Sequence, residues 1–270
     1  MVVLGGTATS AVRLPRQIGI IAAFGAAYFL VRGATDAAYG EAVDNADTLV
    51  EFEKSVGMYA EPEMQRAALD VPGLSNVLNW IYIWGHWPVI IGTLIWLARG
   101  HPEIYRRTRN AMLLSGGIGL LVFVSFPVAP PRLADLGMLD TVSDQSHAYR
   151  VLQPAIFTNQ YAALPSLHVG WNLLMGIAIV FAARSVAGKV FGVVMPVTMV
   201  SAVVLTANHY IVDAVAGALL TVTCWMVFRP GRPKQGPQKW AAQGWSRPVR
   251  PRQPVAAVAR PSGVGSRNAR

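Results

Sequence analysis

Apolar residues along the chain gather in long runs that polar segments separate. Their length matches helices that cross a bilayer, since about 20 apolar residues span its hydrocarbon core. The runs lie at 17–31, 75–97, 110–128, 167–183, 190–207 and 209–228. The pattern predicts an all-α, polytopic membrane protein, built as a six-transmembrane-helix bundle.

The first run, 17–31, is short and follows Arg13 and Arg16. A basic flank before a short apolar core also describes a signal peptide, but no small-residue cleavage site follows at once. We therefore interpret it as an uncleaved span. This interpretation divides the chain into a cytoplasmic N-terminus (1–16), a membrane-embedded catalytic domain (17–228) and a tail (229–270).

An acidic segment, 33–74, separates the first two runs. Within it Leu49, Phe52, Val56 and Tyr59 recur at helical spacing, which predicts one amphipathic helix along the membrane surface. We interpret this helix as a cover that packs on the extracytoplasmic end of the bundle.

The charges sort by side of the membrane once six spans are drawn. One side holds 18 of the 23 Lys and Arg, and the other holds 12 of the 14 Asp and Glu. Basic residues mark the cytoplasmic side. The tail, 229–270, has ten Lys and Arg and no acid, so we expect it to be disordered, cytoplasmic and close to anionic membrane lipids. The net charge of +9 thus indicates membrane orientation, with no nucleic acid as partner.

Two polar clusters stand at the starts of apolar runs. Pro165 suits the first turn of a helix, where Ser166 and His168 would lie among free amides and form an anion site. The four-residue spacing of His209 and Asp213 places both on one helical face, where the carboxylate can hold the imidazole in one tautomer.

A third cluster ends the run at 110–128, where three prolines precede Arg132. Prolines so close together cannot continue a helix. Arg132 after them has two interpretations: a fixed guanidinium that binds an anion, or a simple interfacial residue. With six spans, Arg132, Ser166 and His209 all fall on the extracytoplasmic side. The spans follow from the apolar runs alone, so the convergence of these three residues on one side favours one common site.

His86 lies near the middle of the run at 75–97, one turn from Tyr82. An ionisable residue within a span is a functional hypothesis by default. Tyr82 could equally satisfy it as a structural partner, so both interpretations stay open.

This set of residues suits phosphoryl transfer without a metal. Arg132 and Ser166 would bind phosphate oxygens. His209, oriented by Asp213, would attack phosphorus, and His168 would serve as acid and then as base. No cofactor is expected, and the one cysteine, Cys224, permits neither an intrachain disulfide nor a cysteine-rich metal motif.

The motifs themselves resemble a known family. Pro165-Ser-Leu-His168 and His209-Tyr-Ile-Val-Asp213 are similar to the second and third signatures of the type 2 phosphatidic acid phosphatase superfamily. The longer phrases Tyr161-Ala-Ala-Leu-Pro-Ser-Leu-His-Val-Gly-Trp171 and Phe126-Pro-Val-Ala-Pro-Pro-Arg132 resemble its inositol phosphorylceramide synthase branch and bacterial relatives.

The resemblance covers roughly residues 40–228. It implies a six-helix core and a lipid phosphate or phospholipid substrate. It also implies His209 as nucleophile, Asp213 as orienting acid, His168 as acid and base, and Ser166 and Arg132 as phosphate ligands. We expect the enzyme in the plasma membrane, with an extracytoplasmic site.

The chain departs from the phosphatase pattern at three places. Leu167 replaces a glycine, Val203 stands where an arginine is usual, and no lysine precedes Arg132 near Ser125. The predicted phosphate cage is therefore less basic, and this difference favours the synthase-like branch. Further candidates for the site, including groups that would compensate, are His86, Tyr82, Arg150, His147 and Asn208.

Other classes of protein were weighed. A metal-dependent membrane hydrolase would use His86, His168, His209 and Asp213 as ligands, but the chain lacks the histidine boxes of a di-iron site, and one His-x-x-x-Asp is thin support for zinc. A transporter or non-catalytic lipid-binding protein would show inverted repeats. A serine protease would need Gly-x-Ser-x-Gly around Ser166. The acceptor, water or a hydroxyl group, stays open, as does the oligomeric state.

Overall fold

The computed structural model describes residues 39–142 and 161–228, with the helical positions 19, 20, 23 and 26. These residues form eight α-helices and one short 3₁₀ helix, so the described part of the chain is all-α, as predicted. The chain divides into two units, Met1–Pro230 and Gly231–Arg270, and all these helices belong to the first. The predicted N-terminal segment 1–16, most of the first span and the basic tail lie outside the described residues.

Several described helices are apolar enough to cross a membrane. By length and composition, α6 (Pro102–Ser125) and α10 (Val186–Leu205) each qualify alone. The pair α4 (Leu74–Trp84) and α5 (Trp87–Gly100) qualifies together, with a bend of 42° between them. The apolar helices α9 (Leu167–Ala182) and α11 (Ile211–Val227) are shorter. Apolar helices of this kind fit a membrane protein, with two or three candidate spans among the described residues, and the six-span bundle stays a prediction.

The bend within the second run has a local cause. Pro88 lies in the first turn of α5, and its missing N–H leaves the end of α4 without a continuing hydrogen bond. The helix breaks at Gly85 and His86, where Gly85 ends α4 and His86 precedes α5. The break places His86 at the corner between the two helices.

The stretch 98–109, between the second and third apolar runs, is almost entirely helical. Helix α5 continues to Gly100 and α6 begins at Pro102, so His101 alone separates them. Proline is well suited to the start of a helix, which explains why a single residue is enough. Arg99 lies in the last turn of α5, and the other arginines of this stretch lie on α6. The guanidinium of Arg107 stacks 3.8 Å from the ring centre of Trp225.

The acidic segment forms two short helices, α2 (Tyr39–Ser55) and α3 (Glu61–Leu69), instead of the single predicted one. Gly57, at a φ of 71°, turns the chain between them. The predicted apolar face was right at Leu49 and Tyr59 and wrong at Phe52 and Val56. Ala42, Ala46, Leu49, Val50 and Glu53 are buried, whereas Phe52 and Val56 are about half exposed. The small alanines let α2 lie close to the Val128–Ala134 segment in one cluster.

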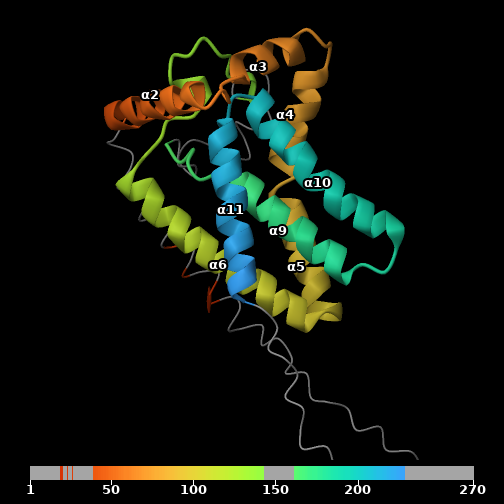
Figure 1. Ribbon diagram of the computed structural model, residues 1–270. Helices are drawn as coiled ribbons and strands as arrows, with labels where there is room; N and C mark the ends of the chain where they lie inside the picture. Colours follow the sequence, from red (N-terminus) through yellow and green to blue (C-terminus); the bar gives the residue numbers. More distant parts are fainter. Residues whose placement is uncertain (1–18, 21–22, 24–25, 27–38, 143–160, 229–270) are drawn as a thin grey trace, which may run out of the picture. The chain divides into compact units, whose positions relative to one another are not determined.

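Helix α9 lies at the centre, in contact with α5, α6, α10 and α11 (Figure 1). Its contact with α11 depends on two glycines. A Cβ atom at Gly217 would collide with the carbonyl oxygen of Ser166, and one at Gly170 would collide with the hydroxyl of Thr221. This close approach brings the starts of α9 and α11 together.

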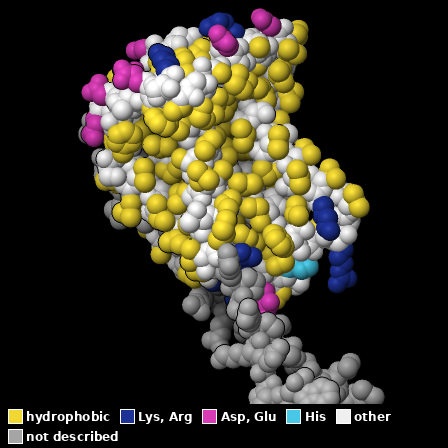
Figure 2. Space-filling model, in the orientation of Figure 1, with side chains coloured by type: hydrophobic (Ala, Val, Ile, Leu, Met, Phe, Trp, Pro, Cys, Tyr) yellow, Lys and Arg dark blue, Asp and Glu magenta, His cyan; other side chains and the backbone are white. Residues whose placement is uncertain are grey.

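The surface of the helical unit carries two kinds of side chain in different places. Hydrophobic side chains cover the middle of the face drawn in Figure 2, and acidic side chains gather at its upper end, over α2 and α3. The starts of α9 and α11 lie toward this acidic end (Figure 1).

Candidate active site

The start of α9 carries the first of the predicted polar clusters. Ser166 is the N-cap of the helix, and its hydroxyl accepts a hydrogen bond from the Val169 amide at 3.4 Å. Pro165 therefore precedes the helix instead of lying in its first turn. The amide of Ser166 donates to the carbonyl of Asp213 at 3.0 Å, which ties this cap to α11. His168 lies in the first turn, as predicted, and is partly exposed.

The second cluster joins His209 and Asp213 as the spacing predicted, although His209 precedes the helix. Helix α11 begins at Ile211, and Tyr210 is its N-cap. The Nδ1 atom of His209 lies 3.0 Å from the carbonyl oxygen of Ala163 and 3.1 Å from Oδ2 of Asp213. A carbonyl oxygen can only accept, so Nδ1 carries the proton and Nε2 keeps a free electron pair. Both side chains are buried.

Three imidazoles lie in a row across the site. The ring centre of His168 lies 5.6 Å from that of His209 and 4.3 Å from that of His86. Tyr82 stacks on His168 at 4.8 Å. His168 thus lies between His86 and His209, and it is close enough to His209 for both rings to contact one small substrate group.

His86 has a polar partner that the sequence did not reveal. The amide nitrogen of Asn172 lies 2.9 Å from Nδ1 of His86 and also donates to the carbonyl of His168 at 2.9 Å. Because that nitrogen is a donor, Nδ1 of His86 accepts and the proton of a neutral ring lies on Nε2. Asn172 is one turn after His168 on a helix with an apolar pattern, and only this spacing could have indicated it.

Arg132 belongs to the same site and makes two different contacts. Its Nε donates to Oδ1 of Asn208 at 3.1 Å, and its Nη1 donates to Oδ2 of Asp140 at 3.0 Å. Asn208 is held in turn by Thr206, whose hydroxyl accepts from its amide at 2.7 Å. Asn208 and Asp140 therefore orient the guanidinium of Arg132. The candidates His147 and Arg150 lie outside the described residues.

Two acidic residues of the surface helices also reach the start of α11. Glu53 of α2 accepts from the amide of Val212 at 2.7 Å, and Glu61 of α3 accepts from the amide of Ile211 at 2.8 Å. Burial, together with the neighbouring Glu61, raises the pKa of Glu53 to about 8. The acidic segment was interpreted only as a cover, so the sequence missed these contacts.

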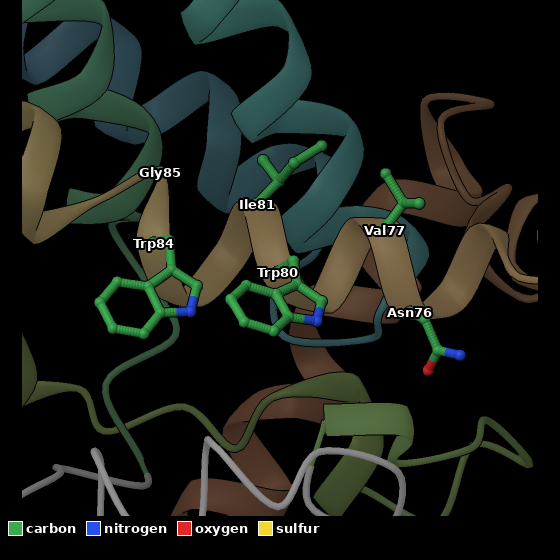
Figure 3. A pocket seen from close by; sticks show the side chains of 6 residues that line it. All are labelled: Asn76, Val77, Trp80, Ile81, Trp84 and Gly85. Atoms are coloured by element: carbon green, nitrogen blue, oxygen red, sulfur yellow. The ribbon is translucent and has the colours of Figure 1, made fainter.

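A shallow groove of about 480 Å³ lies on α4, apart from the histidines. Figure 3 shows the indole rings of Trp80 and Trp84 side by side along it, with Asn76 farther along the helix. The two ring centres are 5.9 Å apart. The groove ends at Gly85, directly before His86, but none of the predicted site residues lines it.

The site combines the buried imidazole of His209, the neighbouring imidazole of His168 and the oriented guanidinium of Arg132. Such a set can bind an anion, attack it and exchange a proton with it. Within the described ranges, no three His, Cys, Asp or Glu side chains are grouped so that they could hold a metal ion.

Comparison with known proteins gives one match. The family model of the PAP2 superfamily matches residues 47–227, which include the candidate residues from Glu53 to Asp213. No curated protein and no solved structure gives a significant match. Membership of this superfamily implies a phosphatase-type enzyme. The family model covers about two thirds of the 270 residues, and the chain therefore belongs to the PAP2 superfamily.

Proposed function

We propose that the protein is an integral membrane enzyme that transfers or hydrolyses a phosphoryl group of a lipid-linked substrate through a phosphohistidine. The observation that carries the proposal is the pair of hydrogen bonds that Nδ1 of His209 donates to Ala163 and Asp213, which leaves Nε2 unprotonated beside His168. The carboxylate of Asp213 would stabilise the positive charge that the ring gains on attack.

In the first half of the reaction, Nε2 of His209 forms a bond to phosphorus. The bond between phosphorus and the lipid oxygen breaks, and that oxygen takes a proton from the imidazolium of His168. Arg132 neutralises charge on the phosphate oxygens. The Ser166 hydroxyl, which accepts from the Val169 amide as the cap of α9, would donate its own proton to a phosphate oxygen.

In the second half, neutral His168 accepts a proton from the acceptor. The acceptor oxygen forms a bond to phosphorus, and the bond from phosphorus to Nε2 breaks. Both histidines return to their starting states. Water as acceptor gives a phosphatase, and a lipid or polyol hydroxyl gives a phosphotransferase.

The phosphotransferase candidate has specific support. Val203 is fully buried in an apolar cluster, and Leu167 packs against Gly119, so neither position adds a cation or an open backbone to the phosphate site. A less basic site suits a branch that resembles inositol phosphorylceramide synthases. In this proposal the rings of Tyr82 and His86 contact the ring of His168 and hold it in position.

The proposal places the site at the outer face of the plasma membrane, beside the acidic helices α2 and α3, and the tail 229–270 in the cytoplasm. The division into segments 1–16, 17–228 and 229–270 belongs to the same proposal. It names lipid phosphate or phospholipid as substrate and requires no cofactor.

The test uses purified protein in lipid nanodiscs with a phosphate-labelled phospholipid, with and without hydroxyl acceptors. We expect His209→Ala to abolish turnover and His168→Ala to accumulate label on His209. Transfer of label to an added alcohol would identify a phosphotransferase, and release of inorganic phosphate alone would identify a phosphatase. Full turnover by His209→Ala would disprove the mechanism.

A further inference from the structure

Glu53 and Glu61 are both fully buried, although they belong to the acidic surface helices. Burial of a carboxyl group is costly unless hydrogen bonds replace the lost water. Their neighbours on the same helices, Glu51 and Glu63, are exposed. A solvent-facing acidic surface therefore does not explain why Glu53 and Glu61 are buried.

Their hydrogen bonds converge on one short stretch of backbone. The amides of Tyr210, Ile211 and Val212 donate to Asp213, Glu61 and Glu53 respectively, at 2.9, 2.8 and 2.7 Å. The first amides of a helix have no partner within it, and the positive end of its dipole favours negative charge. Three carboxyl groups thus occupy the start of α11, and His209 directly precedes this stretch.

The two glutamates also adjoin each other. Glu61 accepts from two backbone amides, those of Ile211 and Ala60. The Oε2 atom of Glu53 receives no hydrogen bond from the described residues, and the carboxyl of Glu61 lies within hydrogen-bonding reach. A proton carried by Glu53 and donated to Glu61 satisfies both groups. The pKa of Glu53, raised to about 8 by burial, agrees with a protonated group at pH 7.

We propose that Glu53 and Glu61 form a carboxyl clamp, joined by one shared proton, that fixes the start of α11 and so orients His209 and Asp213. Both glutamates are positioning residues, since they contact backbone and not the reacting atoms. The orienting role rests on the function proposed above, whereas the fixing of the backbone does not.

The clamp predicts a dependence on pH. The ionisable groups near Glu53 include Glu61, Asp213, Tyr59 and Tyr210, and the ammonium of Lys54 lies over the ring of Tyr59. Above about pH 8 Glu53 loses its proton and becomes a second anion beside Glu61. Repulsion between the two then loosens the start of α11, and activity should fall. Glutamine at position 53 keeps both hydrogen bonds and has no proton to lose.

The first experiment measures amide hydrogen exchange of the full chain in nanodiscs, in the peptide that contains residues 210–212. Glu53→Ala and Glu61→Ala should each accelerate exchange at these amides about tenfold, because each removes a hydrogen-bond acceptor. Glu53→Gln should exchange at the wild-type rate. Glu51→Gln and Glu63→Gln are matched controls on the exposed faces of the same helices.

The second experiment measures kcat and KM for the labelled phospholipid between pH 6 and 10. Glu53→Ala should lower kcat about tenfold with little change in KM, since orientation of the nucleophile is lost while phosphate contacts stay. Glu53→Gln should match wild type at pH 7 and retain activity to higher pH. If the alanine variants do not fold, Glu53→Gln and Glu61→Gln still report the pH profile.

Two results would overturn the clamp. One is unchanged exchange at residues 210–212 in both alanine variants, and the other is an alkaline limb in Glu53→Gln that coincides with that of wild type. The exchange result does not depend on the reaction class, whereas the alkaline limb is read from turnover of the phospholipid. A protein whose turnover survives His209→Ala, yet whose exchange responds to Glu53→Ala, would refute the proposed function and retain the backbone clamp.

Discussion

At the scale of single residues, Arg132 makes a contact to Asp140 that a substrate phosphate would replace. Its Nη1 donates to Asp140, and its side chain is almost fully buried by neighbours. A phosphate oxygen has the same charge and acceptor chemistry as the carboxylate oxygen. We therefore expect Asp140 to compete with the substrate phosphate for this donor.

Asp140→Asn should lower KM about fivefold with kcat unchanged. The variant keeps an oxygen acceptor for the loop and removes the competing charge, whose effect we take as about 1 kcal/mol. Initial-rate kinetics with the labelled phospholipid measure it. Asp135→Asn is a suitable control, because Asp135 is exposed and asparagine tolerates its φ of 50°. An increase in KM would mean that Asp140 assists binding.

Part of this site could be predicted from the sequence. The pair His209 and Asp213 followed from spacing, because four residues bring side chains together at a helix start. Asp140 and Asn172 could not be predicted, since a loop acid and a polar residue in an apolar run look alike whether they face the site or not. Glu53 and Glu61 were missed because acids in an amphipathic segment normally face water.

At the scale of elements, the site depends on how closely α9 approaches α11. Gly217 faces the carbonyl of Ser166 with no room for a further atom. This backbone contact thus helps to place the start of α9, with Ser166 and His168.

Gly217→Ala should destabilise the protein by about 1–3 kcal/mol and reduce turnover more than stability alone explains. The added methyl group must push Ser166 away, so the distance between His168 and His209 changes. Thermal unfolding and kcat of the same sample test this expectation. Gly92→Ala is the control, because its added Cβ meets no neighbour within 4 Å. Wild-type turnover in Gly217→Ala would show that α9 tolerates the shift.

Helix boundaries were predictable where apolar runs end abruptly. The expected ranges 167–183 and 190–207 lie close to α9 and α10. The segment 33–74 was harder, since helical spacing of apolar residues does not say which face is buried. There tertiary packing favoured the small alanines of α2 over the larger Phe52 and Val56.

At the scale of the whole molecule, the sorting of charge predicts which end faces the cytoplasm. The acidic helices α2 and α3 lie at one end of the helical unit. A short loop that contains Arg184 joins α9 to α10. The six spans and their orientation remain proposals that labelling can test.

Single cysteines introduced into a Cys224→Ala background provide that test. Glu51 on α2 and Arg184 after α9 are both exposed, so Glu51→Cys and Arg184→Cys present reachable thiols. An impermeant maleimide should label Glu51→Cys in intact cells and Arg184→Cys only after permeabilisation. The cysteine-free parent, labelled in parallel, gives the background. The reverse pattern would invert the proposed topology.

In the proposed orientation, helix α2 is accessible from outside the cell. One face of it is exposed through Phe52, while its opposite face delivers Glu53 to the backbone beside the histidine pair. An antibody or a water-soluble ligand that bound α2 and shifted it slightly would move the Glu53 carboxyl away from the Val212 amide of α11. Inhibition of this enzyme would then not require a molecule that enters the bilayer or resembles a lipid.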